Sequence, residues 1–327
     1  MLRYIARKAA GWFLMIVVAT NITYFLANSF LKPASNYTAL RPPRTPAQIN
    51  HSLALYNLNP DKPILDRWWR WFSDILLHFD WGRSPTGGSV NGQVVYRVFT
   101  SGQLVLGATI LSIVIGVGLG VFTASRQYKP SDRAFQGLSV LSFNVPSAVA
   151  SLAVVLVAIA LNQSLGDTLL PVAGAQDPDV SGFWAVFGSR VNHAILPTIS
   201  LTFISYAGYH LLQRSLLLDN INSDYVRTAR AKGLTRQQAI RRHGLRTSII
   251  PVATQVAFAM PALFTGAVIT ETVFAWHGMG EYFVKTISTN DVHGAVAVAA
   301  FGALMTAIGA ILADLAVVAL DPRIRVS

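Results

Sequence analysis

Six long apolar stretches divide the chain, and no charged residue lies at the centre of any of them. A helix needs about 20 mainly apolar residues to cross the roughly 30 Å hydrocarbon core of a bilayer. The stretches are continuous rather than alternating with a period of two, which favours helices over the strands of a membrane barrel. We therefore predict an all-α membrane protein with six transmembrane helices, at approximately residues 11–31, 103–124, 135–161, 194–218, 249–276 and 295–320.

The segment between the first two of these helices has a different pattern. It begins with a polar, proline-rich stretch around Pro33, Pro42, Pro43 and Pro46, for which we expect an extended, poorly structured chain. From residue 64 to residue 79, apolar residues recur every three or four positions, which predicts an amphipathic helix. Its tryptophans suit a membrane interface, and the sequence leaves open whether they pack against transmembrane helices or bind a partner protein.

The composition agrees with a membrane location. Hydrophobic residues make up 52% of the 327 residues and charged residues only 13%, an imbalance that a single soluble core of this size would not accommodate. The net charge of +11 also occurs in nucleic-acid-binding proteins, but the basic residues here lie where anionic lipid headgroups meet them. We therefore expect membrane lipids, and no nucleic acid, among the partners. The chain has no cysteine, which excludes disulfides.

Lysine and arginine residues indicate the orientation in the membrane. If the amino terminus is cytoplasmic, sixteen of the 26 basic residues lie on the cytoplasmic side, and two of the three outer connections hold only Arg190 and Lys285. The first helix is expected to remain as a signal anchor, because its apolar run is long and no clean cleavage motif follows it. The predicted order is a cytoplasmic amino terminus at 1–10, a first transmembrane helix at 11–31, an extracytoplasmic segment at 32–102, a five-helix core at 103–320 with a cytoplasmic loop at 219–248, and a cytoplasmic tail at 321–327.

The cytoplasmic loop at residues 219–248 carries the signals of two short helices. Asn222, Ser223 or Asp224 can cap the amino end of the first helix, and Gly233 can take the left-handed conformation that ends it. An isolated helix of this length would be marginal in water, because helix nucleation is costly. Another element must therefore hold it in place.

A second short helix is predicted directly after the first. Thr235 is followed three residues later by Gln238, which is a capping-box pattern. Gly244 is expected to end this second helix. The loop is thus predicted to be a pair of helices.

Small residues occur on one part of the first loop helix, at Ala229, Ala231 and Gly233. Low side-chain bulk permits the backbone of another protein to come close, as a docking helix requires. The basic residues Arg227, Arg230 and Lys232 fit equally well a helix that lies on anionic lipid. The residues alone leave both interpretations open.

The loop and several other segments resemble a known family. The resemblance is strongest in DYVRTARAKGL, from Asp224 to Leu234, and in RHGLRTSIIP, from Arg242 to Pro251, which look like the EAA loop of permeases in binding-protein-dependent ABC importers. Similarity to the first of the two paired permeases of dipeptide and oligopeptide importers is found in Asp61-Lys-Pro63, in DWGRS from Asp80, in ETVFAWHGMG from Glu271 and in LDPRIR from Leu320. The resemblance extends over nearly the whole chain.

This resemblance implies a type I ABC importer permease with six transmembrane helices, an outer segment after the first helix and a cytoplasmic coupling loop. The implied function is ATP-driven import of dipeptides or oligopeptides by alternating access at the bacterial inner membrane. The implied partners are a second homologous permease, one or two ABC ATPase subunits and an extracytoplasmic peptide-binding protein. The implied ATPase-coupling residues are Asp224, Tyr225, Arg227, Thr228, Ala229, Arg230, Ala231, Lys232, Gly233 and Leu234.

The chain itself is expected to be neither an ATPase nor another enzyme. It contains no Gly-x-x-x-x-Gly-Lys-Ser/Thr loop, so ATP and magnesium are expected on the ATPase subunits and no cofactor on this chain. It also has no His-Glu-x-x-His motif, no Gly-x-Ser-x-Gly motif and no cysteine nucleophile, and its histidines lack the spacing of metal ligands. We therefore predict no catalytic and no metal site.

Polar residues within the predicted helices are candidates for the solute path, because such residues normally face a bundle interior, a cavity or another subunit. The candidates are Asn144, Pro146 and Ser147 in the third helix and Gln255, Met260 and Pro261 in the fifth. Helix packing explains the same residues equally well. Glu271, near the outer end of the fifth helix, is a candidate latch for the turn at Gly278 and Gly280.

Two alternatives to peptide import remain open. The first is an ABC permease for another small solute, such as a metal chelate or an oligosaccharide, because the substrate is selected largely by the binding protein. The second is an ion-coupled secondary transporter, which would be expected to place a carboxylate or a broken helix near the membrane midplane. The sequence shows no convincing carboxylate there and no obvious inverted repeat.

Overall fold

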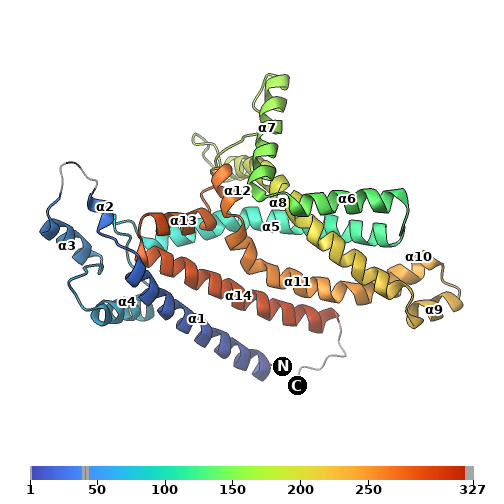
Figure 1. Ribbon diagram of the computed structural model, residues 1–327, viewed down its shortest axis with the longest axis horizontal. Helices are drawn as coiled ribbons and strands as arrows, with labels where there is room; N and C mark the ends of the chain where they lie inside the picture. Colours follow the sequence, from blue (N-terminus) through green and yellow to red (C-terminus); the bar gives the residue numbers. More distant parts are fainter. Residues whose placement is uncertain (1, 39–40, 42–43, 321–327) are drawn as a thin grey trace. The chain divides into compact units, whose positions relative to one another are not determined.

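The computed structural model describes the backbone of residues 2–38, 41 and 44–320, and every regular element in these residues is a helix (Figure 1). The all-α prediction is thus confirmed for this part of the chain. In chain order the elements are α1 (Leu2–Phe30), α2 (Ser35–Thr38), α3 (Pro46–Leu55), α4 (Ile64–His78), α5 (Val90–Ala124), α6 (Pro130–Asn144), α7 (Ser147–Leu165), α8 (Phe183–Ile221), α9 (Asp224–Ala231), α10 (Arg236–Ala239), the π-helical turn η1 (Ile240–Gly244), α11 (Leu245–Gly266), α12 (Val268–Val273), α13 (Met279–Ser288) and α14 (Val292–Leu320).

Five helices of the described residues are long and apolar enough to cross a membrane, namely α1, α5, α7, α8 and α14. Helices α1, α5, α8 and α14 correspond to the predicted first, second, fourth and sixth spans. Helix α5 has 35 residues and begins well before the predicted start, and α8 has 39 residues and is longer at both ends. The predicted tail at residues 321–327 lies outside the described residues.

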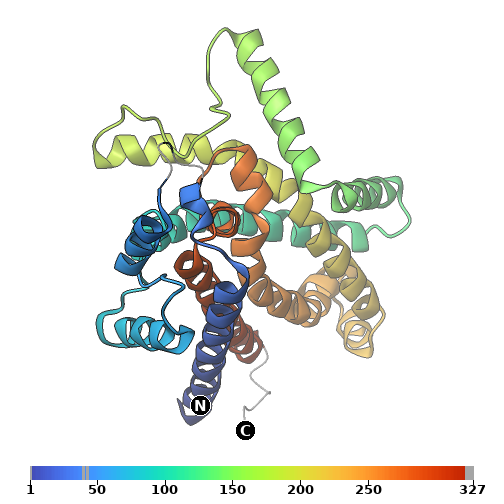
Figure 2. The same cartoon turned by 60° about the vertical axis from the view of Figure 1, so that its left-hand side comes forward.

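The third predicted span, residues 135–161, is wrong as a single helix. Helix α6 ends at Asn144, the backbone of Val145 is extended, and α7 starts after Pro146. Proline lacks an N–H donor and forces the preceding residue out of the helical conformation, which explains the break. Helix α7 turns sharply away from α6 in both views of the structure (Figures 1 and 2).

The fifth predicted span, residues 249–276, is also interrupted. Helix α11 ends at Gly266, the shorter α12 follows after Ala267 and ends at Val273, and the last predicted residues form a turn. In that turn Ala275 is left-handed, with φ of 48°, and the Trp276 N–H donates to the carbonyl of Glu271 at 2.8 Å. The prediction located this stretch but not its division.

The expectation of an extended chain after the first helix is wrong in part. Helix α3 forms there because Thr45 caps it in a complete capping box with Gln48, and Pro46 occupies the first helical position, where its missing N–H costs nothing. Pro42 and Pro43 lie outside the described residues. The local signal Thr-Pro-x-Gln was present in the sequence and indicates a helix start.

The chain divides into two compact units, and each is described by itself. Unit 1 consists mainly of residues Gly102–Trp276 with the end of α14 from Ile308 onward. Unit 2 consists of Leu2–Ser101 and His277–Ala307. Helices α5 and α14 each contribute residues to both units.

In unit 2, the amphipathic helix α4 packs against α1, which confirms the predicted helix and explains its tryptophans. The Trp71 ring is buried and stacks on Tyr24, with 4.5 Å between ring centroids. The Trp68 indole N–H donates to Asn21 at 2.6 Å, and Val296 of α14 completes this core. Packing inside the chain therefore accounts for Trp68 and Trp71, whereas Trp69 is 63% exposed.

In unit 1, helix α8 binds its neighbours through buried polar side chains. Arg214 donates to both carboxylate oxygens of Asp132 at 2.8 and 2.9 Å, which joins α8 to the start of α6. His210 lies within hydrogen-bond distance of Ser139 at 2.6 Å and of Thr123 at 2.9 Å, on α6 and α5 respectively. These contacts fix both neighbouring helices along α8.

Breaking the Asp132–Arg214 pair is expected to destabilise the protein strongly. Asp132 is 1% exposed, so the D132N variant leaves the Arg214 guanidinium without its buried partner, at a cost of about 3–5 kcal/mol. We expect a clearly lower Tm for D132N in thermal unfolding of the detergent-solubilised protein. D224N is the matched control, because Asp224 and Arg227 are exposed and 3.9 Å apart, and its Tm should match the wild type.

The stabilisation by the Asp132–Arg214 pair is expected to depend on pH. The Arg214 guanidinium holds the pKa of the Asp132 carboxyl below its usual value of 3.8. The stabilisation is therefore complete above pH 3.8 and is lost as the pH falls through the lower folded-state pKa. The Tm difference between wild type and D132N should shrink in that acidic range, and a difference that stays constant would contradict this account.

Candidate functional site

The predicted coupling loop forms a compact helical hairpin in unit 1, made of α9, α10 and η1 (Figure 1). Ser223 occupies the cap position of α9, but its hydroxyl donates to the Asn220 carbonyl at 2.7 Å instead of capping the helix. Asp224 lies in the first turn and Arg230 in the last, each at the end of the helix dipole that favours its charge. The first predicted helix of the loop is thus confirmed.

Gly233 ends α9 in the way that the sequence predicts. Its φ of 92° is left-handed, its N–H donates to the Arg230 carbonyl at 3.0 Å, and the Leu234 N–H donates to the Ala229 carbonyl at 3.3 Å. These two bonds are the Schellman pattern, and the Leu234 side chain packs against the cluster that contains Ala229, the position that this motif places next to it. The chain therefore reverses tightly between α9 and α10.

The start of α10 is confirmed, but its predicted end is wrong. Thr235 and Gln238 form a complete capping box, with bonds of 3.0 and 3.3 Å. Gly244 does not end the helix, because its φ of −64° and ψ of −44° are helical and η1 leads directly into α11. The Gln213 amide donates to Ser248 at 2.9 Å, and this contact between α8 and α11 holds the backbone helical beyond Gly244.

The hairpin has its own small core, which supplies the support that a short helix needs. Val226 and Ala229 of α9 and Ala239 of α10 are buried against one another. Ala229 is only 6% exposed, so it does not belong to an open small-residue surface as the sequence suggested. Its small side chain lets α10 approach α9. Ala231 and Gly233 are exposed, and no atom lies within 4 Å of a Cβ built at Gly233.

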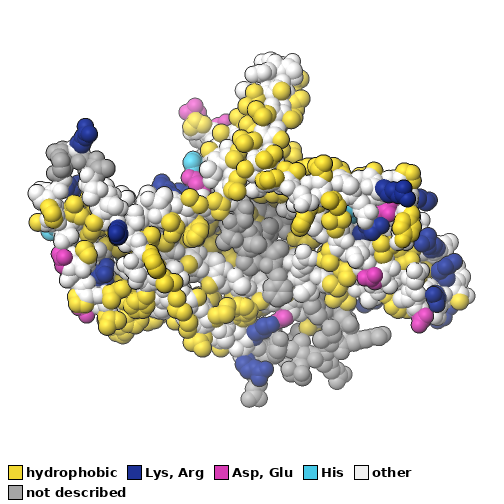
Figure 3. Space-filling view, in the orientation of Figure 1, with side chains coloured by type: hydrophobic (Ala, Val, Ile, Leu, Met, Phe, Trp, Pro, Cys, Tyr) yellow, Lys and Arg dark blue, Asp and Glu magenta, His cyan; other side chains and the backbone are white. Residues whose placement is uncertain are grey.

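The remaining predicted coupling residues surround this core. The exposed ones are Asp224, Tyr225, Arg227, Thr228, Arg230, Ala231, Lys232 and Gly233, and Leu234 is half-buried. The Tyr225 hydroxyl donates to Asn220, which anchors it to the end of α8. Figure 3 shows Lys and Arg side chains gathered over the part of unit 1 that holds α9 and α10. The hairpin thus presents a basic, solvent-accessible face on a supported backbone.

The predicted solute-path residues are not brought together as one polar face. Asn144, Pro146 and Ser147 form the break between α6 and α7, where the Asn144 amide donates to the Val140 carbonyl at 2.7 Å. Gln255 is exposed on α11. The side chains of Met260 and Pro261 lie outside the described residues. Contact of these residues with a solute stays a prediction.

The predicted latch residues belong to different units. Glu271 is fully buried in α12 of unit 1, whereas Gly278 and Gly280 lie at the start of α13 in unit 2. A latch between them stays a prediction. Within the described residues, no three His, Cys, Asp or Glu side chains come together in a group that could hold a metal ion.

Arg97 holds the turn before α13, and the sequence analysis missed it. Its guanidinium donates to the carbonyls of His277 at 3.3 Å and Gly278 at 3.1 Å and lies 4.8 Å from the Tyr282 ring centroid. Glu281 is 3.8 Å away and balances the charge. One signal in the sequence could have indicated this role, namely an arginine close to an apolar span. The predicted second span began at residue 103, so Arg97 was not considered part of a helix.

Comparisons with known proteins agree with this architecture. Residues 116–326 match the family described as "Binding-protein-dependent transport system inner membrane component". The chain belongs to this family. It is 37% identical over 328 residues to the oligopeptide transport system permease protein OppB of Mycobacterium tuberculosis (strain ATCC 25618 / H37Rv), with all of both chains covered. It is 30% identical to the dipeptide transport system permease protein DppB of Bacillus subtilis (strain 168), covering 99% of this chain and 98% of the relative.

Membership of this family establishes the broad features of the protein. An inner membrane component of a binding-protein-dependent transport system is a multi-pass membrane subunit, and it works with a binding protein and with separate subunits that hydrolyse ATP. The hairpin of α9 and α10 falls inside the matched residues. Contact of the hairpin with those ATPase subunits stays a prediction.

Removing the Arg97 charge is expected to loosen the start of α13. Hydrogen bonds to a charged group contribute about 1.5–3 kcal/mol each, so the R97M variant should raise the amide hydrogen-exchange rates of α13 by roughly tenfold or more. Exchange measured by mass spectrometry on the solubilised protein checks this. R83M is the control, because the Arg83 side chain is exposed. Equal α13 exchange in R97M and R83M would contradict the role of Arg97.

Proposed function

We propose that this chain is a permease subunit of an ATP-driven importer for oligopeptides or dipeptides. The observation that carries this proposal is full-length similarity to permeases of both peptide classes, at 37% and 30% identity. The similarity includes the hairpin and both flanking helices, so it is not limited to a general membrane-helix composition. ATP hydrolysis lies on partner subunits.

The hairpin is proposed to transmit the movement of the ATPase subunits. Its first helix is short and exposes Arg227 and Arg230, and Lys232 follows directly after it. The small core of the hairpin and the caps of its helices keep it from bending locally. It is joined through η1 to α11 without a flexible linker, and Gln213 ties α11 to α8. A displacement of α9 would therefore move α8 and α11 together and open or close the solute path.

The proposed topology has six crossings and two cytoplasmic termini. Helices α6 and α7 would form one discontinuous crossing, and α11 with α12 another. The distribution of basic residues supports this orientation, since sixteen of 26 fall on the proposed cytoplasmic side. A second homologous permease, one or two ATPase subunits and an extracytoplasmic peptide-binding protein complete the proposed complex. Residues 59–84 and 277–292 are the proposed contacts with the binding protein.

Peptide-dependent ATPase activity tests the proposed function. The chain is co-expressed with its partner subunits, reconstituted in lipid nanodiscs and titrated with a binding protein that is either empty or loaded with a peptide pool. We expect the loaded form to stimulate ATP hydrolysis severalfold over the empty form. Activity indifferent to peptide would overturn the substrate class, and uptake driven by an ion gradient without ATP would overturn the ABC mechanism.

A bulky residue at Gly233 is expected to uncouple ATP hydrolysis from transport. A Cβ at this position meets no atom of the chain, so G233A pays only the left-handed backbone strain of roughly 1–2 kcal/mol. G233W adds bulk on the face proposed to contact the ATPase. Peptide stimulation should largely survive in G233A and be lost in G233W. If G233W keeps wild-type stimulation, α9 is not the docking helix.

A further inference from the structure

A cationic cavity of about 490 Å³ lies in unit 1 between the end of α5 and the hairpin. Arg126 and Lys129, in the turn after α5, line one side of it, and Arg236 and Arg241, from α10 and η1, line the other. The described residues that line it include no carboxylate. All four basic side chains are exposed, and none makes an ion pair with a described residue. The site therefore has an uncompensated positive charge.

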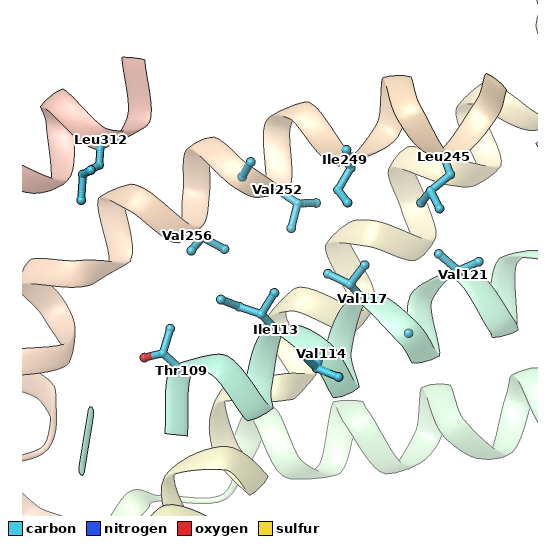
Figure 4. Close-up of a pocket in the computed structure, with 12 residues that line it drawn as sticks. Thr109, Ile113, Val114, Val117, Val121, Leu245, Ile249, Val252, Val256 and Leu312 are labelled. Carbon is cyan, nitrogen blue, oxygen red and sulfur yellow. The ribbon is translucent and has the colours of Figure 1, made fainter. Parts of the chain in front are cut away.

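An apolar groove of about 840 Å³ lies beside this cavity, also in unit 1. Figure 4 shows side chains of α5, such as Ile113 and Val117, facing Ile249, Val252 and Val256 of α11 across it. Among the lining residues whose side chains the structure describes, Thr109 alone carries a side-chain oxygen or nitrogen. Such a surface favours contact with hydrocarbon and supplies few hydrogen-bond or charge partners to a polar molecule.

The two spaces adjoin, because Gly118 and Val121 line both of them. An occupant that fills both the cationic cavity and the apolar groove needs a negative head and a hydrocarbon tail. We propose that it binds an anionic phospholipid, with the phosphate headgroup among Arg126, Lys129, Arg236 and Arg241 and an acyl chain along α5 and α11.

The location fits a lipid of the inner leaflet, which is a step that rests on the proposed topology. Helix α5 ends at Ala124, so the four basic residues lie at the proposed cytoplasmic boundary, where anionic headgroups attract lysine and arginine. The groove walls reach the protein surface at Val114, which is 64% exposed, and at Leu312, which is 40% exposed. A free phosphate ion would account for the cationic cavity but not for the apolar groove.

The end of α5 holds the Arg126 side chain in position for this role. Its guanidinium lies 3.9 Å from the centroid of the Phe122 ring, which belongs to the last turn of α5. Because Arg236 and Arg241 belong to the hairpin, a headgroup between the two pairs would bridge the hairpin to the α5–α6 turn. The lipid would therefore stiffen the proposed coupling element.

Lipid retention measured on the intact complex tests this site. The complex purified in detergent is incubated with phosphatidylglycerol or phosphatidylcholine of equal acyl chains, and bound lipid is counted by native mass spectrometry. We expect severalfold more phosphatidylglycerol to be retained, and severalfold less in R126Q/K129Q. R133Q is the control, because Arg133 is exposed on α6 and does not line the cavity.

A second pair of variants tests the junction of the two spaces. No atom lies within 4 Å of a Cβ at Gly118, so the G118L variant can fold. Its leucine side chain would occupy space where the cavity and the groove adjoin. G137L is the control, because the Cβ position of Gly137 on α6 is equally open. G118L should lower phosphatidylglycerol retention severalfold, and G137L should leave it unchanged.

Four outcomes overturn the proposal. Equal retention of the two lipids, or no effect of R126Q/K129Q and G118L, would exclude an anionic lipid site. Displacement of phosphatidylglycerol by glycerol phosphate at equal concentration would indicate a free-anion site. Loss of a partner subunit in R126Q/K129Q with unchanged lipid retention would indicate a protein interface. Failure of the proposed peptide function leaves lipid retention unaffected, so the two proposals fail separately.

Discussion

Helix α8 carries a row of buried polar side chains that bind three neighbouring helices of unit 1. Tyr206 and His210 lie within hydrogen-bond distance of α6, and His210 also of Thr123 on α5. Gln213 donates to α11, and Arg214 pairs with Asp132 at the start of α6. Apolar side chains discriminate poorly between neighbouring helices and lipid tails, so polar pairs and small residues determine which helices meet and in what register. Gly120 contributes by letting α5 come close beside Gln213, where a Cβ would lie only 2.7 Å away.

The hairpin depends on this register at both of its ends. It follows directly from α8, and it leads through η1 into α11, whose Ser248 is bound by Gln213 of α8. A π-helical turn adds a residue to the local helical repeat, so it changes which face of the following helix points inward. Here η1 lets the chain satisfy the caps of α9 and α10 and still bring Ser248 to α8. The geometry of the hairpin is thus set by the packed helices beside it.

The sequence predicted features that depend on neighbouring residues. The left-handed Gly233, the capping box at Thr235 and the amphipathic α4 follow from signals only a few positions apart, and the structure contains all three. The predictions were wrong or incomplete where contacts between residues far apart in the chain determine the local structure. Gly244 looks like a helix end until the contact between α8 and α11 is known, and Ala229 looks exposed until α10 packs against it. Arg97 acquires its role only when the turn at His277, far along the chain, comes beside it.

The basic residues of the proposed coupling loop fall into two sets in the structure. A docking helix and a lipid-bound helix both explain a cluster of arginine and lysine. In the structure Arg227 and Arg230 lie on α9 and Lys232 directly follows it, and none of the three is among the residues that line the cationic cavity, whereas Arg236 and Arg241 are. The two sets are separated by the tight reversal at Gly233. One face can therefore meet a protein partner while the other meets a headgroup, and the two roles do not compete for the same charges.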